Sequence, residues 1–150
     1  FLGGGGCFID PSHCFLISIG NNVTLSINVV ILSHDASTAK LIGYTKIGKV
    51  VIEDNVFIGA NSLVLPNITI GENSIVGSGS VVTKNVPKNT VVAGNPAKVI
   101  CSVEKYKEKH IKLSNVSKCF SEEYKVNNNP TKEMLEEMIE EVAENICYIK

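Results

Sequence analysis

The chain contains neither tryptophan nor arginine, and aromatic residues make up only 6% of its 150 residues. Without arginine, any phosphate site has to use lysine ammonium groups or backbone N–H groups. Residues 1–100 carry six lysines against five acidic residues, and residues 101–150 carry eight against ten. No basic stripe with interleaved aromatic residues is present, which argues against a nucleic-acid surface.

The chain also lacks a long apolar run and any C-x-x-C pair. A membrane-spanning helix needs roughly 18 consecutive apolar residues, so we expect no membrane span. Five cysteines, an odd number, favour free thiols in a reducing compartment, and we therefore expect a cytoplasmic protein. The chain begins with phenylalanine and shows no secretory signal, which predicts a segment of a longer protein.

What is present is a strict spacing of six. Apolar residues recur at this interval at Ile52, Ile58, Val64, Ile70, Val76 and Val82. The fifth place of each hexad holds a small or β-branched residue, namely Val56, Ser62, Ile68, Ser74 and Ser80. An α-helix cannot explain this spacing, because positions six apart lie on nearly opposite helix faces. A coil of three short strands per turn explains it, so the sequence predicts an all-β solenoid in which Ile52 stacks on Ile70.

Three segments interrupt the spacing, at residues 14–18, 33–46 and 84–89. Inserted backbone inside the coil would leave its polar groups unpaired, so each segment is expected to leave through a corner. The longest, residues 33–46, predicts a projecting loop, and the last predicts a bulge around Pro87. The step of five from Ile47 to Ile52 is not explained by the repeat.

Composition changes near residue 100, where glycine, valine and isoleucine give way to lysine, glutamate and asparagine. We therefore predict two parts, a solenoid over residues 1–100 and an α-helical C-terminal extension over residues 101–150. Apolar spacing predicts one helix over residues 103–113 and a second from about residue 131 to 145. Asn129 is the expected N-cap of the second helix, followed by Pro130 at its first position.

The chain resembles the hexapeptide-repeat O-acetyltransferases in three segments, IGNNVTLSINVVILSHD, VVIEDNVFIGANSLVLPNITIGENSIVGSGSVVTKNVP and VVAGNPAKVI. This family includes the galactoside and maltose acetyltransferases and polysaccharide-modifying relatives. The likeness covers about residues 9–100, with the hexads, the histidine loop and the GNPAK ending in the family's order. It implies a left-handed parallel β-helix, a homotrimer, and acetyl-CoA bound in the groove between neighbouring subunits.

The resemblance makes His34, in the projecting loop, the catalytic residue. Acetyl transfer to an alcohol requires removal of the hydroxyl proton while the oxygen attacks the thioester carbonyl, and a neutral imidazole can accept that proton. We expect direct transfer with His34 as general base and no acetyl-enzyme. A covalent nucleophile, Cys7 or Cys14, is the alternative, but free cysteine is more often a small buried hydrophobe.

Asp10 and Asp35 are the candidate acceptor-binding residues. Asp10 lies one coil before His34, and its alternative role is to shape the turn before Pro11. Asp35 follows His34 directly and either orients the ring or is a solvated loop carboxylate. Family members often place asparagine and aspartate near Asp10, and this chain departs from that pattern.

The resemblance also assigns the cofactor site. The backbone at Gly59 and Ala60 would face the thioester, with an N–H serving the oxyanion. The remaining predicted contacts to the pantetheine, phosphates and adenine are Ser78, Gly79, Thr83, Lys84, Pro96 and Lys98. Small residues let a thin pantetheine arm lie against backbone, and ammonium groups offset phosphate charge. Corner geometry alone would also select these glycines and serines.

Other functions remain as alternatives. A γ-class carbonic anhydrase needs three histidines on zinc, and the histidines of this chain lie 21 and 76 residues apart, so we expect no metal. A sugar-nucleotide N-acyltransferase and a streptogramin-type antibiotic acetyltransferase share the histidine base. A purely structural solenoid would not explain the histidine loop together with the GNPAK ending. Our hypothesis is a cytoplasmic, acetyl-CoA-dependent O-acetyltransferase acting on a hydroxyl of a sugar or surface-polysaccharide precursor.

Overall fold

The computed structural model describes residues 2–150, and the chain divides into two compact units, residues 1–105 and 106–150. The division falls a few residues after the change in composition near residue 100. Each unit is described by itself below.

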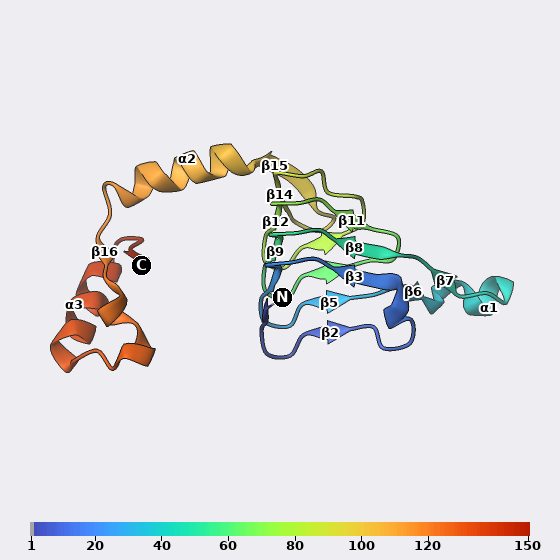
Figure 1. Ribbon diagram of the computed structural model, residues 1–150, viewed down its shortest axis with the longest axis horizontal. Helices are drawn as coiled ribbons and strands as arrows, with labels where there is room; N and C mark the ends of the chain where they lie inside the picture. The colour runs from blue at the N-terminus through green and yellow to red at the C-terminus, as the bar shows by residue number, and fades with distance from the viewer. Residues whose placement is uncertain (1) are drawn as a thin grey trace. The chain divides into compact units, whose positions relative to one another are not determined.

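Three sheets of short strands build the first unit (Figure 1). Sheet A has the order β1 (Leu2–Gly3), β4 (Thr24–Leu25), β9 (Phe57–Ile58), β12 (Ile75–Val76), β14 (Thr90–Ala93) and β15 (Lys98–Ser102). Sheet B has the order β13 (Val81–Val82), β10 (Leu63–Val64), β5 (Val30–Ile31) and β2 (Phe8–Ile9). Sheet C has the order β11 (Thr69–Ile70), β8 (Val50–Ile52) and β3 (Ile17–Ile19).

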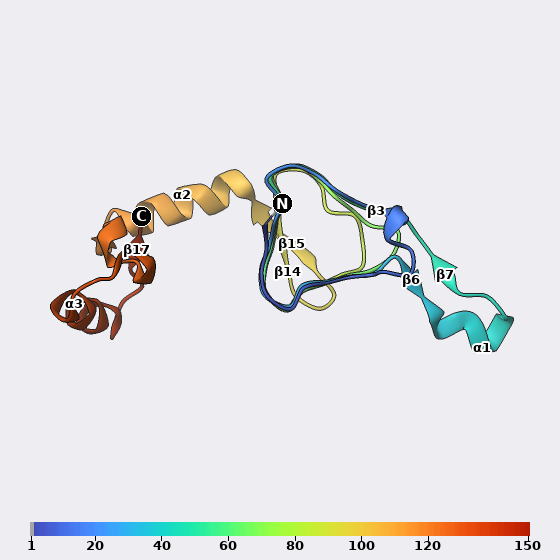
Figure 2. The ribbon, with the colours of Figure 1, turned by 60° about the horizontal axis from the view of Figure 1, so that its bottom comes forward.

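Successive strands belong to sheets B, C and A in turn, so the chain returns to the same sheet after each circuit. Figure 2 looks along this stack and shows its triangular outline. Within these three sheets all pairs are parallel except β14 with β15, which are antiparallel. The predicted stacking is confirmed, because Ile52 pairs with Ile70, and the Ile58–Val76 and Val64–Val82 pairs follow the same register. These side chains are buried and fill the inside of the triangle.

Asparagines occupy the corners between the sheets. Seven of them have positive φ, between 53° and 64°, namely Asn22, Asn28, Asn55, Asn61, Asn67, Asn73 and Asn89. Asparagine tolerates this left-handed conformation better than other residues with a side chain, because its short amide bonds locally. Their amides also stack: Asn55 accepts a bond of 3.3 Å from Asn22 and donates one of 3.1 Å to Asn73. The hexad description of the sequence overlooked this second repeated residue.

The first two interruptions are insertions, as predicted. The first contains η1 (Cys14–Leu16), a single 3-10 turn ahead of β3. The second forms a hairpin of β6 (His34–Asp35) and β7 (Lys46–Ile47), closed by η2 (Ala36–Thr38) and α1 (Ala39–Ile42). Ile47 therefore lies in the hairpin and is exposed. It is not a core residue, which explains the step of five to Ile52.

The third interruption is not a bulge, and that prediction is wrong. Val86 is buried and bridges Ile70 in the position of a sheet C strand. Val92 then pairs with Val76 in sheet A. Residues 84–89 thus form a complete side of the last coil, shortened by two residues.

The helix α2 (Val103–Ser114) begins just before the second unit, and α3 (Lys132–Val142) lies within it. The second unit also contains two 3-10 turns, η3 (Glu122–Tyr124) and η4 (Val126–Asn128), and the paired strands β16 (Cys119–Phe120) and β17 (Tyr148–Ile149). The helix over residues 103–113 is confirmed by α2. The predicted N-cap of α3 is wrong, because Thr131 accepts the Met134 N–H bond while Asn129 ends η4 in the left-handed conformation. Over residues 2–150, no helix combines the length and apolarity that crossing a bilayer would require.

Candidate functional site

His34 lies where the chain leaves the triangle. It follows the carboxyl end of β5 in sheet B and opens the hairpin β6–β7, whose backbone bonds join His34 to Ile47. Because the hairpin leaves through the corner, the imidazole is held close to the coil rather than at the loop tip. Its side chain is 32% exposed, so part of the ring is accessible to a ligand.

Asp10 is the partner of His34. It follows β2, which pairs with β5 in sheet B, and it is completely buried. Its Oδ2 accepts bonds from the Ser33 N–H at 3.1 Å and the Ser33 hydroxyl at 2.8 Å, and forms a hydrogen bond with Nδ1 of His34. Its Oδ1 accepts a 3.0 Å bond from the Ser12 N–H.

These hydrogen bonds determine which atoms of the Asp10–His34 pair carry a proton. Burial acts to raise the pKa of the Asp10 carboxyl, but the bonds from His34, Ser33 and Ser12 outweigh it and hold the pKa below its ordinary value. An ionised carboxylate can only accept, so Nδ1 of His34 is the protonated nitrogen. In the neutral ring the lone pair is then on Nε2, as a general base requires.

Asp35 has different partners. Its carboxylate lies 2.7 Å from the Lys46 ammonium across the hairpin and accepts a 2.9 Å bond from the Ser37 N–H, which caps η2. The Lys46 contact, followed by the Ser37 bonds, holds the pKa of the Asp35 carboxyl below its ordinary value. Asp10, and not Asp35, therefore orients the imidazole.

His13 lies beside His34, a proximity that the sequence analysis did not identify. The centroids of the two rings are 5.5 Å apart, and Nδ1 of His13 is buried without a hydrogen-bond partner among the described residues. Side-chain atoms of Asp10, His13 and His34 all lie within 4.8 Å of one another, a spacing that could suit a metal ion. Asp10 Oδ2 already accepts three bonds, however, and a metal would have to displace at least the one from His34. The arrangement fits a hydrogen-bond network better than a metal site.

The predicted small-residue contacts form a column at another corner. Gly59 and Ala60 precede β10, and Ser78 and Gly79 precede β13 in the next coil, so both pairs lie at the amino ends of sheet B strands. The Gly79 N–H donates a 2.8 Å bond to the Ala60 carbonyl. A Cβ on Gly59 would lie only 2.5 Å from the Ser78 nitrogen, so this corner requires glycine.

The column offers one candidate oxyanion donor. The Gly59 N–H donates a 2.8 Å bond to the Val76 carbonyl and is not free. The Ala60 N–H has no backbone partner in the part of the chain that the structure describes. Of the two predicted positions, only Ala60 can therefore present an N–H to a ligand.

The other four predicted cofactor residues, Thr83, Lys84, Pro96 and Lys98, line one cavity of about 300 Å³ beside the β14–β15 hairpin. Over residues 2–150 neither lysine forms an ion pair with a carboxylate. Thr83 and Lys84 follow β13, so they lie at the carboxyl ends of the sheet B strands, as His34 does. Thr83 and Lys84 thus lie at the opposite end of sheet B from the small-residue column, whereas Lys98 pairs with Ala93, which lies beside Gly77 next to that column.

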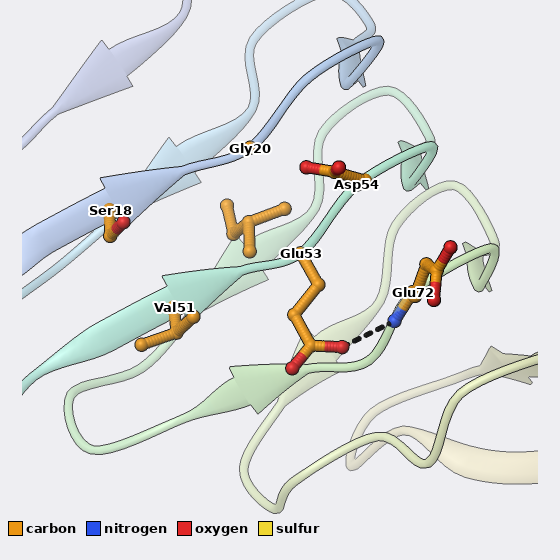
Figure 3. A pocket seen from close by; sticks show the side chains of 7 residues that line it. Ser18, Gly20, Val51, Glu53, Asp54 and Glu72 are labelled. Carbon is orange, nitrogen blue, oxygen red and sulfur yellow. Dashed lines mark hydrogen bonds between the residues drawn. The ribbon is translucent and has the colours of Figure 1, made fainter.

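A second hollow lies over sheet C and carries the opposite charge (Figure 3). Glu53, Asp54 and Glu72 line it, and Glu53 accepts a 2.8 Å bond from the Glu72 N–H. Three carboxylates disfavour phosphate. None of the predicted site residues lines this hollow.

Known proteins with similar sequences and folds agree with the repeats found in this chain. Residues 49–84 match the family model described as bacterial transferase hexapeptide (six repeats). The chain is 41% identical over 93 residues to YvoF of Bacillus subtilis (strain 168), which is 62% of this chain and 52% of YvoF. The chain therefore spans about half the length of this relative.

Two solved structures share the fold. A galactoside acetyltransferase in complex with coenzyme A is 31% identical with a TM-score of 0.61, over 68% of this chain and 52% of that chain. A maltose O-acetyltransferase from Clostridium difficile 630 is 34% identical with a TM-score of 0.55, over 64% and 63%. The family resemblance that the repeats predict is thereby confirmed, and residues 49–84 are a hexapeptide-repeat segment of the bacterial transferase type.

Proposed function

We propose that this chain is the repeat part of an acetyl-CoA-dependent O-acetyltransferase that moves acetyl to a hydroxyl of a sugar or surface-polysaccharide precursor. The observation that carries the proposal is the partly exposed imidazole of His34, held through Nδ1 by the buried carboxylate of Asp10. This is the arrangement of a general base whose second nitrogen is free.

In the proposed reaction Nε2 of His34 takes the proton of the acceptor hydroxyl as its oxygen attacks the thioester carbonyl carbon. The carbon–sulfur bond then breaks, and the thiolate of CoA leaves with the proton returned by His34. Asp10 stabilises the imidazolium that forms between these steps, and the Ala60 N–H is the donor for the oxyanion. No acetyl-enzyme forms.

The cofactor proposal rests on the cavity with two lysines and on the column of small residues. Lys84 and Lys98, which have no carboxylate partner among residues 2–150, would meet the phosphates, and the cavity they share with Thr83 and Pro96 would hold the adenine end. The pantetheine arm would lie along the column of small residues at Gly59, Ala60, Ser78 and Gly79. The galactoside acetyltransferase of similar fold is a coenzyme A complex, which supports this cosubstrate.

The positions of the proposed cofactor residues also support assembly of several copies of the chain. In one copy Thr83 and Lys84 follow a sheet B strand and the small-residue column precedes the sheet B strands, and we propose that a cofactor touching both lies between neighbouring copies. We propose a homotrimer of left-handed parallel β-helices, as in the family that the sequence resembles. All five cysteines are free, which fits the reducing cytoplasm that we expect.

The test is an acceptor screen that reads release of the CoA thiol from acetyl-CoA, run on the wild-type chain and on His34→Ala. The panel contains free sugars, nucleotide sugars, amino sugars and a streptogramin. We expect turnover on hydroxyl acceptors and a loss on the order of 10²-fold or more in His34→Ala. Turnover on amines alone would overturn O-transfer, and near-normal turnover of His34→Ala would overturn the general base.

A further inference from the structure

Ser33 lies at the base of the hairpin that presents His34. It stands between β5 and β6, directly before the histidine, and it is completely buried. Its carbonyl accepts a 2.9 Å bond from the Gly48 N–H, which joins the two ends of the hairpin. A serine hydroxyl without access to water needs a partner inside the protein.

The Ser33 hydroxyl has two possible acceptors. Its Oγ lies 2.8 Å from Oδ2 of Asp10 and 3.2 Å from the carbonyl of His13. That carbonyl already accepts a 2.9 Å bond from the Leu16 N–H. A hydroxyl has one proton, and the shorter contact and the negative charge both favour the carboxylate. Ser33 therefore donates its hydroxyl proton to Asp10.

The Asp10 carboxylate shares its charge among several donors. Oδ2 accepts the Ser33 N–H and hydroxyl and bonds to His34, and Oδ1 accepts the Ser12 N–H. Apart from the imidazole, the Ser33 hydroxyl is the only one of these donors that belongs to a side chain. Each donor on the carboxylate leaves less of its charge to act on the imidazole.

This sharing matters for a general base. A carboxylate bonded to a histidine favours the imidazolium, and an imidazolium cannot accept a proton. The proposed reaction begins with a neutral ring, so the pull of Asp10 on the ring has to be limited. The other titratable or charged groups on the segments beside the ring are His13, Cys14, Asp35 and Lys46. Asp35 and Lys46 pair with each other, which leaves Asp10 as the uncompensated charge on His34.

We propose that Ser33 is a positioning residue whose hydroxyl draws charge from Asp10 and so keeps the His34 ring neutral and able to accept a proton. This inference rests on the proposed function, in which His34 is the base. Ser33 acts only through Asp10. It contacts neither substrate and takes up no proton during the reaction.

The first measurement needs no substrate. NMR spectra that correlate the ring nitrogens and carbon-bound protons of histidine distinguish imidazole from imidazolium, and the His34 signals are assigned by their loss in His34→Ala. At pH 7 we expect a larger imidazolium fraction in Ser33→Ala than in the wild type, because Asp10 loses a donor and holds the ring proton more strongly.

Ser74→Ala is the matched control. Ser74 is also completely buried, and its hydroxyl donates a 2.8 Å bond to the Pro87 carbonyl, but it has no contact with Asp10 or His34. The substitution removes the same atom from an equally buried site. It should leave the imidazolium fraction of His34 unchanged.

The second measurement is the pH profile of kcat/KM for an acceptor found in the screen. We expect the acid limb in Ser33→Ala to lie about one pH unit higher, so that activity falls about tenfold on the acid side and is unchanged on the alkaline side. Ser74→Ala should keep the wild-type profile. An equal loss at every pH in Ser33→Ala would show a purely structural role and would overturn the inference.

The outcomes separate the two proposals. If the wild type turns over no acceptor, the proposed function fails, while NMR still decides whether Ser33 acts on the ring. If the wild type is active but the imidazolium fraction is the same in Ser33→Ala, the inference about Ser33 alone is wrong. Should Ser33→Ala not fold, Ser33→Cys, whose thiol is a weaker donor, should show a smaller shift in the same direction, and no shift would equally contradict the inference.

Discussion

Asp10 is the residue on which the geometry of His34, the proposed base, depends. It is completely buried, yet all of its oxygen contacts are donors: two backbone N–H groups, one hydroxyl and the imidazole N–H. An amide in its place turns one oxygen into an NH2 group that faces a donor. The same substitution removes the charge that would stabilise the imidazolium in the proposed reaction.

We therefore expect Asp10→Asn to lower kcat on the order of 10²-fold while KM for acetyl-CoA stays near its wild-type value. Steady-state kinetics of CoA release would measure both constants. Asp35→Asn is the comparison, because Asp35 contacts Lys46 and Ser37 and not the ring. A larger loss of kcat in Asp35→Asn than in Asp10→Asn would contradict the assignment.

Asp10 also predicts how stability depends on pH. Its pKa in the folded protein lies below the ordinary value of about 3.9, so the unfolded chain binds the proton first as pH falls. Its contribution is complete above roughly pH 5 and is lost progressively below about pH 4. Urea midpoints should fall more steeply from pH 5 to 3 in the wild type than in Asp10→Asn, and equal slopes would refute the prediction.

The position of His34 could be predicted from the sequence, whereas its partner was not. The histidine stands in the longest departure from the hexads, and the family order marks it. The Asp10 contact joins residues 24 positions apart on adjacent strands. Extending the register that pairs Ile9 with Ile31 would have revealed it, because that register places Asp10 beside the start of the hairpin.

At the scale of elements, the coil is held by two repeated features, the apolar residue at each sixth position and a positive-φ corner residue that is asparagine at most corners and glycine at Gly6 and Gly79. Side-chain amide bonds link Asn22 to Asn55 and Asn55 to Asn73, so Asn55 has a bonded neighbour on each side. A 3.1 Å bond from Asn73 to Asn89 continues this amide ladder. Hydrogen bonds between stacked corners tie each coil to the next. They also fix the backbone where φ is positive.

Variants of Asn55 separate these two effects. Asn55→Gly keeps the backbone conformation but removes two bonds, and should lower the free energy of unfolding by about 1 kcal/mol. Asn55→Ala also strains the positive φ and should cost about 1 kcal/mol more. Asn67 is the matched control: its φ is 64°, and its side chain has no bond within residues 2–150, so Asn67→Gly should be nearly neutral. Equal losses at the two sites in urea titrations would rule out the ladder.

The hexads predicted the coils but not how the coils end. The steps from Ile9 to Ile19 and from Val82 to Val92 are both ten, yet the first is one side with an insertion and the second is two sides, of which the one ending at Val86 is two residues short. Spacing alone cannot separate these cases. The side ending at Val86 can be short because, within residues 2–150, no further strand pairs with it in sheet C.

At the scale of the molecule, the residues proposed to bind the cofactor present a geometric problem. His34 and Lys84 follow sheet B strands, while Ala60 and Ser78 precede them, and the strands of a parallel sheet all run the same way. His34 follows β5 and Lys84 follows β13, two strands further, so these residues lie roughly 10 Å apart along one corner. The small-residue column lies at a different corner of the triangle.

A cyclic trimer solves this problem if each site takes its base from one copy and its small-residue column from the next. The test mixes two inactive variants, His34→Ala and Ser78→Trp, which obstructs the column at an exposed side chain. After random reassembly of equal amounts, about three quarters of the trimers are mixed, and each has one intact junction. Activity should therefore return to about a quarter of the wild-type level. If each copy carried a complete site, the mixture would stay inactive, and the proposed shared cleft would be wrong.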